Sequence, residues 1–156
     1  MKVLLHKGFW GILLAWLLVG CDNKTNTTAE TTPPSPPTTT EKATYVDRVN
    51  WIKDLDTAFS LSKEQNKPLI VMVESHGCRW CIKMKEETLN APDVLKKLDE
   101  FVIVKVLREN PADRSRLPEF KHVPIMFFYQ PNGELFDSLR GYFIAEDFLE
   151  YLNELN

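Results

Sequence analysis

The hydrophobic and polar positions of this chain follow several patterns, and each pattern predicts a structural element. Apolar residues recur at helical spacing over 51–62, which predicts a first helix. The runs 68–73 and 101–107 are apolar at successive positions, which is typical of strands buried on both faces. Between these runs, a helix is predicted over 78–90 and a short helix over 93–98. The inward positions of the first helix are predicted to be Trp51, Ile52, Leu55, Ala58, Phe59 and Ser62.

The remaining pattern predicts a hairpin followed by a helix. A polar segment over 108–121 predicts a short helix, and residues 123–129 form an apolar run typical of a strand. The sequence Pro131-Asn132-Gly133-Glu134 is typical of a hairpin turn, so residues 135–140 are predicted to pair back antiparallel. A last helix is predicted from about Ala145. This order of elements predicts an α/β fold in which helices flank a mixed central β-sheet.

The N-terminal part of the chain lacks this organisation. Residues 1–20 place two lysines around the start of the apolar stretch 9–19, which is the pattern of an export signal. The stretch is too short to span a bilayer comfortably, because a membrane helix needs roughly 20 residues. Residues 21–44 are rich in threonine and proline without periodic apolar positions, which predicts a disordered tether. The folded domain is therefore predicted over 45–156.

Net charge narrows the classes of partner. The full chain carries 19 lysines and arginines against 22 aspartates and glutamates, a formal charge of −3. Removal of the export signal would take away two lysines and no acid, leaving 17 basic against 22 acidic residues and a charge of −5. This balance argues against nucleic acid or an anionic lipid surface as the main partner.

The strongest chemical signal is a Cys-x-x-Cys motif formed by Cys78 and Cys81, shortly after the buried run 68–73. Two sulfurs three positions apart lie on one helix face and can close a disulfide. The first sulfur at a helix N-terminus meets unpaired N–H groups, which favour the thiolate. The motif predicts thiol–disulfide exchange, with Cys78 as nucleophile, Cys81 as resolving thiol and no diffusible cofactor. The alternative interpretation is that Cys78 and Cys81 form a buried pair with a structural role only.

Side chains beside the cysteines suggest supporting roles. The positive charge of Arg79 is predicted to lower the pKa of the Cys78 thiol, and His76 is a second candidate for that tuning. Trp80 is predicted to offer an apolar flank to the substrate. His76 and His122 also leave open a metal-binding or metallochaperone function, since two thiolates and an imidazole are ligands for zinc or copper. The alternative for both histidines and for Arg79 is that they are ordinary solvated side chains without a role in the chemistry.

These motifs and their order resemble the thioredoxin superfamily over nearly all of 45–156, and more specifically its thioredoxin-related periplasmic branch. The Cys-x-x-Cys motif, Val123-Pro124 at the start of a strand, Asn132-Gly133 in a turn and Gly141 before the last helix match the pattern of that family. The resemblance implies that Pro124 is a cis-proline opposite the dithiol and contributes to catalysis. It also implies that Val123 pairs with the backbone of an extended substrate.

The sequence departs from the family at two places. Arg79-Trp80 stands between the cysteines where thioredoxin has Gly-Pro. The buried acid that the family carries on the strand before the motif falls on Met72, which cannot move a proton. Glu74 is the nearest acid and is expected on a different phase of the strand. The route by which Cys81 loses its proton is therefore open.

The sequence Leu18-Val19-Gly20-Cys21 resembles the lipobox of bacterial lipoproteins. The resemblance implies cleavage before Cys21, acylation of its sulfur, and anchoring in the cell envelope with the domain facing the periplasm. A plain secretory signal and an uncleaved anchor helix are the alternatives, and the choice of inner or outer membrane stays open. Lipidation also explains the odd cysteine, because it leaves one pair among three.

Together these observations predict a membrane-anchored thiol–disulfide oxidoreductase. Its partners are predicted to be protein thiols or disulfides and a membrane redox protein that recycles the cysteine pair. The small domain favours a reductase of protein disulfides, although the charge of Arg79 favours the oxidising direction. The competing prediction is a metal-binding protein that uses Cys78, Cys81 and a nearby histidine.

Overall fold

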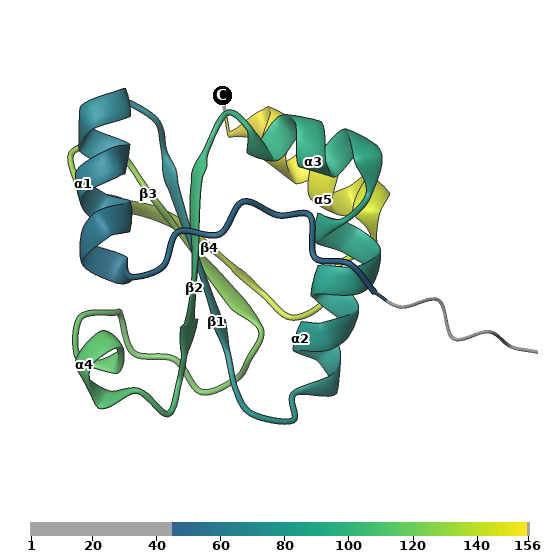
Figure 1. Ribbon diagram of the computed structural model, residues 1–156, viewed down its shortest axis with the longest axis horizontal. Helices are drawn as coiled ribbons and strands as arrows, with labels where there is room; N and C mark the ends of the chain where they lie inside the picture. Colours follow the sequence, from purple (N-terminus) through teal and green to yellow (C-terminus); the bar gives the residue numbers. More distant parts are fainter. Residues whose placement is uncertain (1–44, 156) are drawn as a thin grey trace, which may run out of the picture. The chain divides into compact units, whose positions relative to one another are not determined.

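The computed structural model describes residues 45–155, which form a four-stranded sheet with helices on both faces (Figure 1). The strand order is β2-β1-β3-β4, with β1 parallel to β2 and antiparallel to β3, and β3 antiparallel to β4. The strands are β1 (Leu69–Glu74), β2 (Val102–Leu107), β3 (Ile125–Tyr129) and β4 (Leu135–Arg140). The helices are α1 (Leu55–Gln65), α2 (Arg79–Lys83), the π-helix η1 (Met84–Leu89), α3 (Pro92–Leu98), α4 (Pro111–Arg114) and α5 (Ala145–Glu154). The predicted α/β fold with a mixed sheet is confirmed.

The helices divide between the two faces of the sheet. Figure 1 shows α1 and α4 on one side and α2, α3 and α5 on the other. Alternate residues of β1 belong to different cores, with Val71 packed on the α1 side and Met72 on the α2 and α5 side. Because side chains alternate across a strand, the central strand contributes to both layers, and its first five residues are all buried. The apolar pattern of 68–73 therefore correctly predicted a strand covered on both faces.

The first helix begins later than its apolar spacing predicted. The prediction was wrong for Trp51 and Ile52, which precede α1 in extended backbone. Ile52 forms a β-bridge with Val104, and its N–H donates to the Ile103 carbonyl at 2.9 Å. Asp54 caps the helix, since its carboxylate accepts the Thr57 N–H at 2.8 Å, and this bond lowers the pKa of that carboxyl. The cap at Asp54 therefore determines where the helix begins, although two apolar residues precede it at helical spacing.

Two further boundaries differ from the predictions. The helix that follows the cysteines has the predicted extent but changes from α to π geometry at Met84. The strand predicted from Val123 begins at Ile125, so Val123 and Pro124 precede the ladder with β4. The change to π geometry begins three residues after Cys81.

Residues 1–44 and 156 lie outside the described part of the chain. The predictions of an export signal over 1–20, a tether over 21–44 and acylation of Cys21 concern that part. None of the helices between residues 45 and 155 is long and apolar enough to cross a bilayer.

Candidate active site

The cysteine pair lies at the carboxyl end of β1, where the chain turns into α2. Cys78 and Cys81 form a disulfide, with an S–S distance of 2.06 Å and a Cα–Cα distance of 5.3 Å. Gly77, at φ 67°, makes the turn that leads into the helix, a conformation that glycine adopts without strain. Cys78 is the N-cap of α2, and its Sγ accepts the N–H of Cys81 at 3.1 Å. The helix start therefore already directs an N–H donor at the first sulfur.

The two sulfurs differ in accessibility. Cys81 is 1% exposed and belongs to the core that includes Met72 and Met84. Cys78 is only partly buried at the edge of that core. A close cysteine pair at a helix start supports thiol–disulfide exchange, and this difference makes Cys78 the sulfur that a large partner reaches first.

Val123 packs against the same core as Cys78, and Trp80 lies between the two cysteines in the sequence. The Val123–Pro124 peptide bond is cis, and the Pro124 carbonyl accepts the Gly141 N–H at 2.8 Å. These residues line a cavity of about 320 Å³, and Tyr142 completes its lining. Trp80 is 49% exposed. The structure thus brings together Trp80, Val123 and Pro124, which the sequence placed in one site from distant segments.

The charged candidates lie outside the core. Arg79 is exposed, with its guanidinium carbon 5.9 Å from the centroid of the Trp80 ring, and His76 is exposed in the loop before Cys78. His122 is exposed and lines a different cavity of about 520 Å³ with Lys121 and Arg140. Across residues 45–155, no group of three or more His, Cys, Asp or Glu side chains is placed to hold a metal ion. The metal-binding alternative thus has no donor set in the described residues.

A cluster beside the cavity escaped the sequence interpretation. The Tyr142 hydroxyl donates to Glu87 Oε2 at 2.8 Å, and its ring centroid lies 5.6 Å from that of Trp80. Lys83 Nζ lies 3.5 Å from Glu87 Oε2 and 4.6 Å from the centroid of the Tyr142 ring. The available signal was an aromatic residue directly after Gly141, because that glycine had already been matched to the one that precedes the last helix.

Glu74, the acid nearest to Met72, lies on a different face of the strand from the one predicted. Met72 and Glu74 are two residues apart on β1, so they point to the same face, and the expectation of a different phase was wrong. Glu74 Oε2 lies 2.6 Å from Lys85 Nζ, and the two side chains are 15% and 16% exposed respectively. This ion pair joins β1 to the helical segment that carries Cys81.

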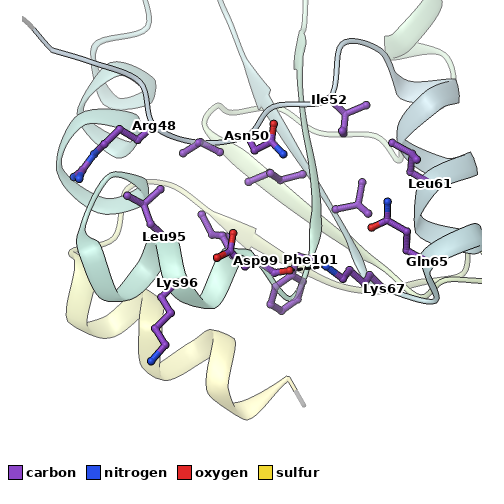
Figure 2. Close-up of a pocket in the computed structure, with 14 residues that line it drawn as sticks. Arg48, Asn50, Ile52, Leu61, Gln65, Lys67, Leu95, Lys96, Asp99 and Phe101 are labelled. Carbon is purple, nitrogen blue, oxygen red and sulfur yellow. Dashed lines mark hydrogen bonds between the residues drawn. The ribbon is translucent and has the colours of Figure 1, made fainter.

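A further cavity, larger than the one beside Pro124, has a lining that includes neither cysteine. It has a volume of about 410 Å³ where α1, α3, β2 and residues 48–52 meet. Figure 2 shows Leu61 of α1 on one side of this cavity and Leu95 of α3 on the other, with Asn50 above. It shares no lining residue with the cavity beside Pro124.

The fold is similar to those of solved thiol–disulfide proteins. A thioredoxin from Thermus thermophilus matches with a TM-score of 0.58 and 25% sequence identity, over 69% of this chain and 86% of that chain. The C-terminal domain of DsbD from Neisseria meningitidis, in its oxidised form, matches with a TM-score of 0.55 and 23% identity, over 65% and 91%. The second likeness concerns the fold alone.

Curated sequence relatives match this chain over only a part of their length. Spermatogenesis-associated protein 20 of Mus musculus is 34% identical over 96 residues, which cover 54% of this chain and 12% of that protein. Anterior gradient protein 3 of Mus musculus is 22% identical over 98 residues, covering 62% and 58%. The chain therefore spans about an eighth to three fifths of the length of these relatives. The family model of the thioredoxin-like domain matches residues 55–156, and the chain belongs to that family.

Proposed function

We propose that this protein is a membrane-anchored, periplasm-facing thiol–disulfide oxidoreductase that reduces protein disulfides. The observation that carries the proposal is the cysteine pair itself, in which an accessible Cys78 at a helix start is joined to a buried Cys81. Pro124 and Trp80 line the surface beside this pair. An accessible first sulfur and a protected second sulfur are the arrangement that a two-step exchange requires.

In the first step, the Cys78 thiolate attacks one sulfur of a substrate disulfide. A bond forms between Cys78 Sγ and that sulfur, the substrate S–S bond breaks, and the other substrate sulfur leaves as a thiolate. The helix-start N–H of Cys81, which already points at Cys78 Sγ from 3.1 Å, favours the attacking thiolate. Val123 precedes the β3 ladder and offers its backbone to the substrate strand.

In the second step, Cys81 resolves the mixed disulfide. Its thiol loses a proton, its sulfur attacks Cys78 Sγ, and the second substrate sulfur leaves as a thiolate that takes up a proton. Two electrons pass to the substrate, and the Cys78–Cys81 disulfide is formed again. Recycling then requires a dithiol donor, and we assign that role to a redox protein of the membrane.

The anchor in this proposal is a lipid on Cys21. Its support is the match of Leu18-Val19-Gly20-Cys21 to the lipobox pattern behind an apolar stretch. Replacement of Cys21 by serine should release the protein from the membrane fraction and abolish labelling with a palmitate analogue. Labelled, membrane-bound C21S protein would refute the anchor.

The direction of electron flow is tested by the reduction potential of the Cys78–Cys81 pair. The full chain in detergent is equilibrated with ratios of reduced to oxidised glutathione, and the two forms are separated after thiol trapping. A potential near about −270 mV supports a reductase, whereas a potential near about −120 mV marks a disulfide donor. A pair that never exchanges would refute the oxidoreductase itself.

A further inference from the structure

The cavity beside Pro124 has a lining that is almost entirely apolar. Its walls come from three segments, with Trp80 on α2, Val123 and Pro124 before β3, and Gly141 and Tyr142 after β4. Its volume of about 320 Å³ lies at the low end of the range for ligand pockets, which suits one large side chain. Nearly half of the Trp80 surface is exposed here, so an apolar occupant would remove it from water.

Tyr142 is held in place as a wall of this cavity. Its hydroxyl is bonded to Glu87 at 2.8 Å, and the Lys83 ammonium lies 4.6 Å from its ring centroid and 5.5 Å from that of Trp80. The two rings are 5.6 Å apart and tilted by 38°. The hydrogen bond and the shared cation fix both rings before a substrate arrives, which lowers the entropic cost of binding.

The backbone of the same loop is anchored at two points. The Gly141 N–H donates to the Pro124 carbonyl at 2.8 Å, and the buried Thr88 hydroxyl donates to the Phe143 carbonyl. Gly141 adopts φ 94°, a conformation that other residues rarely reach. Tyr142 lies between these two anchors, which hold its backbone beside the cavity, while the bond to Glu87 holds its ring.

We propose that Tyr142 determines substrate specificity, by forming with Trp80 a pocket for a bulky apolar side chain next to the reacting cysteine of a polypeptide substrate. The proposal rests on the proposed function, because it requires a substrate joined to Cys78. During exchange the substrate sulfur is bonded to Cys78 Sγ, and Cys78 packs against the same core as Val123 and Tyr142, two residues of the cavity lining. Residues beside that sulfur therefore lie against the cavity. Glutathione carries no bulky apolar side chain there and bypasses the pocket.

The test compares two dimeric peptide disulfides that differ only at the positions flanking cysteine, leucine in one and glycine in the other. The full chain is reduced, desalted and mixed with each peptide, and samples are quenched with acid and analysed by mass spectrometry. We expect the leucine peptide to react about tenfold faster, the effect of burying part of one aliphatic side chain. Equal rates with the two peptides would overturn the proposal.

Variants assign the preference to Tyr142. Y142A should bring the ratio of the two rates close to one, whereas Y142F should keep most of it, because the ring stays although its bond to Glu87 is lost. L135A is the matched control, since Leu135 is 40% exposed at the opposite end of β4 and should leave the ratio at the wild-type value. A tenfold preference that survives in Y142A would refute the role of Tyr142.

The reaction with glutathione disulfide distinguishes failure of the pocket from failure of the proposed function. A wild-type chain that reacts with glutathione disulfide but shows no peptide preference refutes only the pocket. A wild-type chain that reacts with neither glutathione disulfide nor the peptides refutes the proposed function, and the pocket with it.

Discussion

The ion pair between Glu74 and Lys85 gives a quantitative test of how the cysteine-bearing helix is held on the sheet. Its atoms are 2.6 Å apart, and the side chains are 15% and 16% exposed. Replacing Glu74 by glutamine leaves the Lys85 ammonium unpaired in a mostly buried position. Breaking a fully buried pair costs about 3–5 kcal/mol, and an exposed pair is worth about 0.2–1 kcal/mol. At this intermediate exposure we expect E74Q to lower the free energy of unfolding by about 2 kcal/mol.

The assay is urea unfolding of the oxidised protein at pH 7, followed by circular dichroism. The control is D56N, because Asp56 pairs with Arg116 at a similar distance of 2.7 Å but with 82% and 41% of the two side chains exposed. We expect D56N to cost no more than about 1 kcal/mol, including its place in the first turn of α1. Equal losses in the two variants would refute the assignment of the E74Q effect to burial.

Three further predictions concern the sulfurs, the loop and a buried tyrosine. C81S should accumulate a mixed disulfide with a protein substrate on non-reducing gels, and C78S should form none; trapping by both would contradict the order of attack. T88V removes the hydroxyl that donates to the Phe143 carbonyl and should cost about 1–2 kcal/mol in urea unfolding, whereas an unchanged midpoint would show that the bond contributes no stability. Burial raises the pKa of Tyr129 from 10.0 to about 12, so the folded state holds its proton longer than the unfolded state. Its contribution to stability is complete below pH 10 and is lost between about pH 10 and 12. Y129F should lose less stability over that interval, and identical alkaline profiles for the two proteins would contradict this.

Much of the fold could be predicted because its strongest signals are local. The strand β1 is buried on both faces, so its apolar run needs no partner to be recognised. The start of α1 could not be placed from spacing, because Ile52 is apolar for a different reason, namely its bridge to the edge strand β2 at Val104. Periodicity reports that a residue is buried and does not report which partner buries it. The cap at Asp54 carried the missing information.

The residues of the candidate site also differ in how well the sequence alone identifies them. Cys78, Cys81 and Pro124 were found because their chemistry or backbone is distinctive in the sequence itself. Tyr142 was missed because its partners lie on distant segments, and the fold is needed to bring this half-buried loop residue beside Trp80. Glu74 was recognised but given the wrong face of the strand, and its pairing with Lys85 depends on how the helical segment packs on β1.

The cysteines and Tyr142 lie on segments that are far apart in the sequence, so the two parts of the site can change separately. The attacking and resolving sulfurs lie on one helix, whose start follows directly from β1. The wall that we assign to substrate choice lies after β4, about 60 residues later in the chain, and meets the helix through Glu87 and Lys83. A change at Tyr142 alters the cavity without altering the sulfurs or the N–H that faces Cys78. Selectivity can therefore change with the loop while the exchange chemistry stays with the helix, because the loop meets the helical segment through the side chains of Lys83, Glu87 and Thr88 and not through the cysteines.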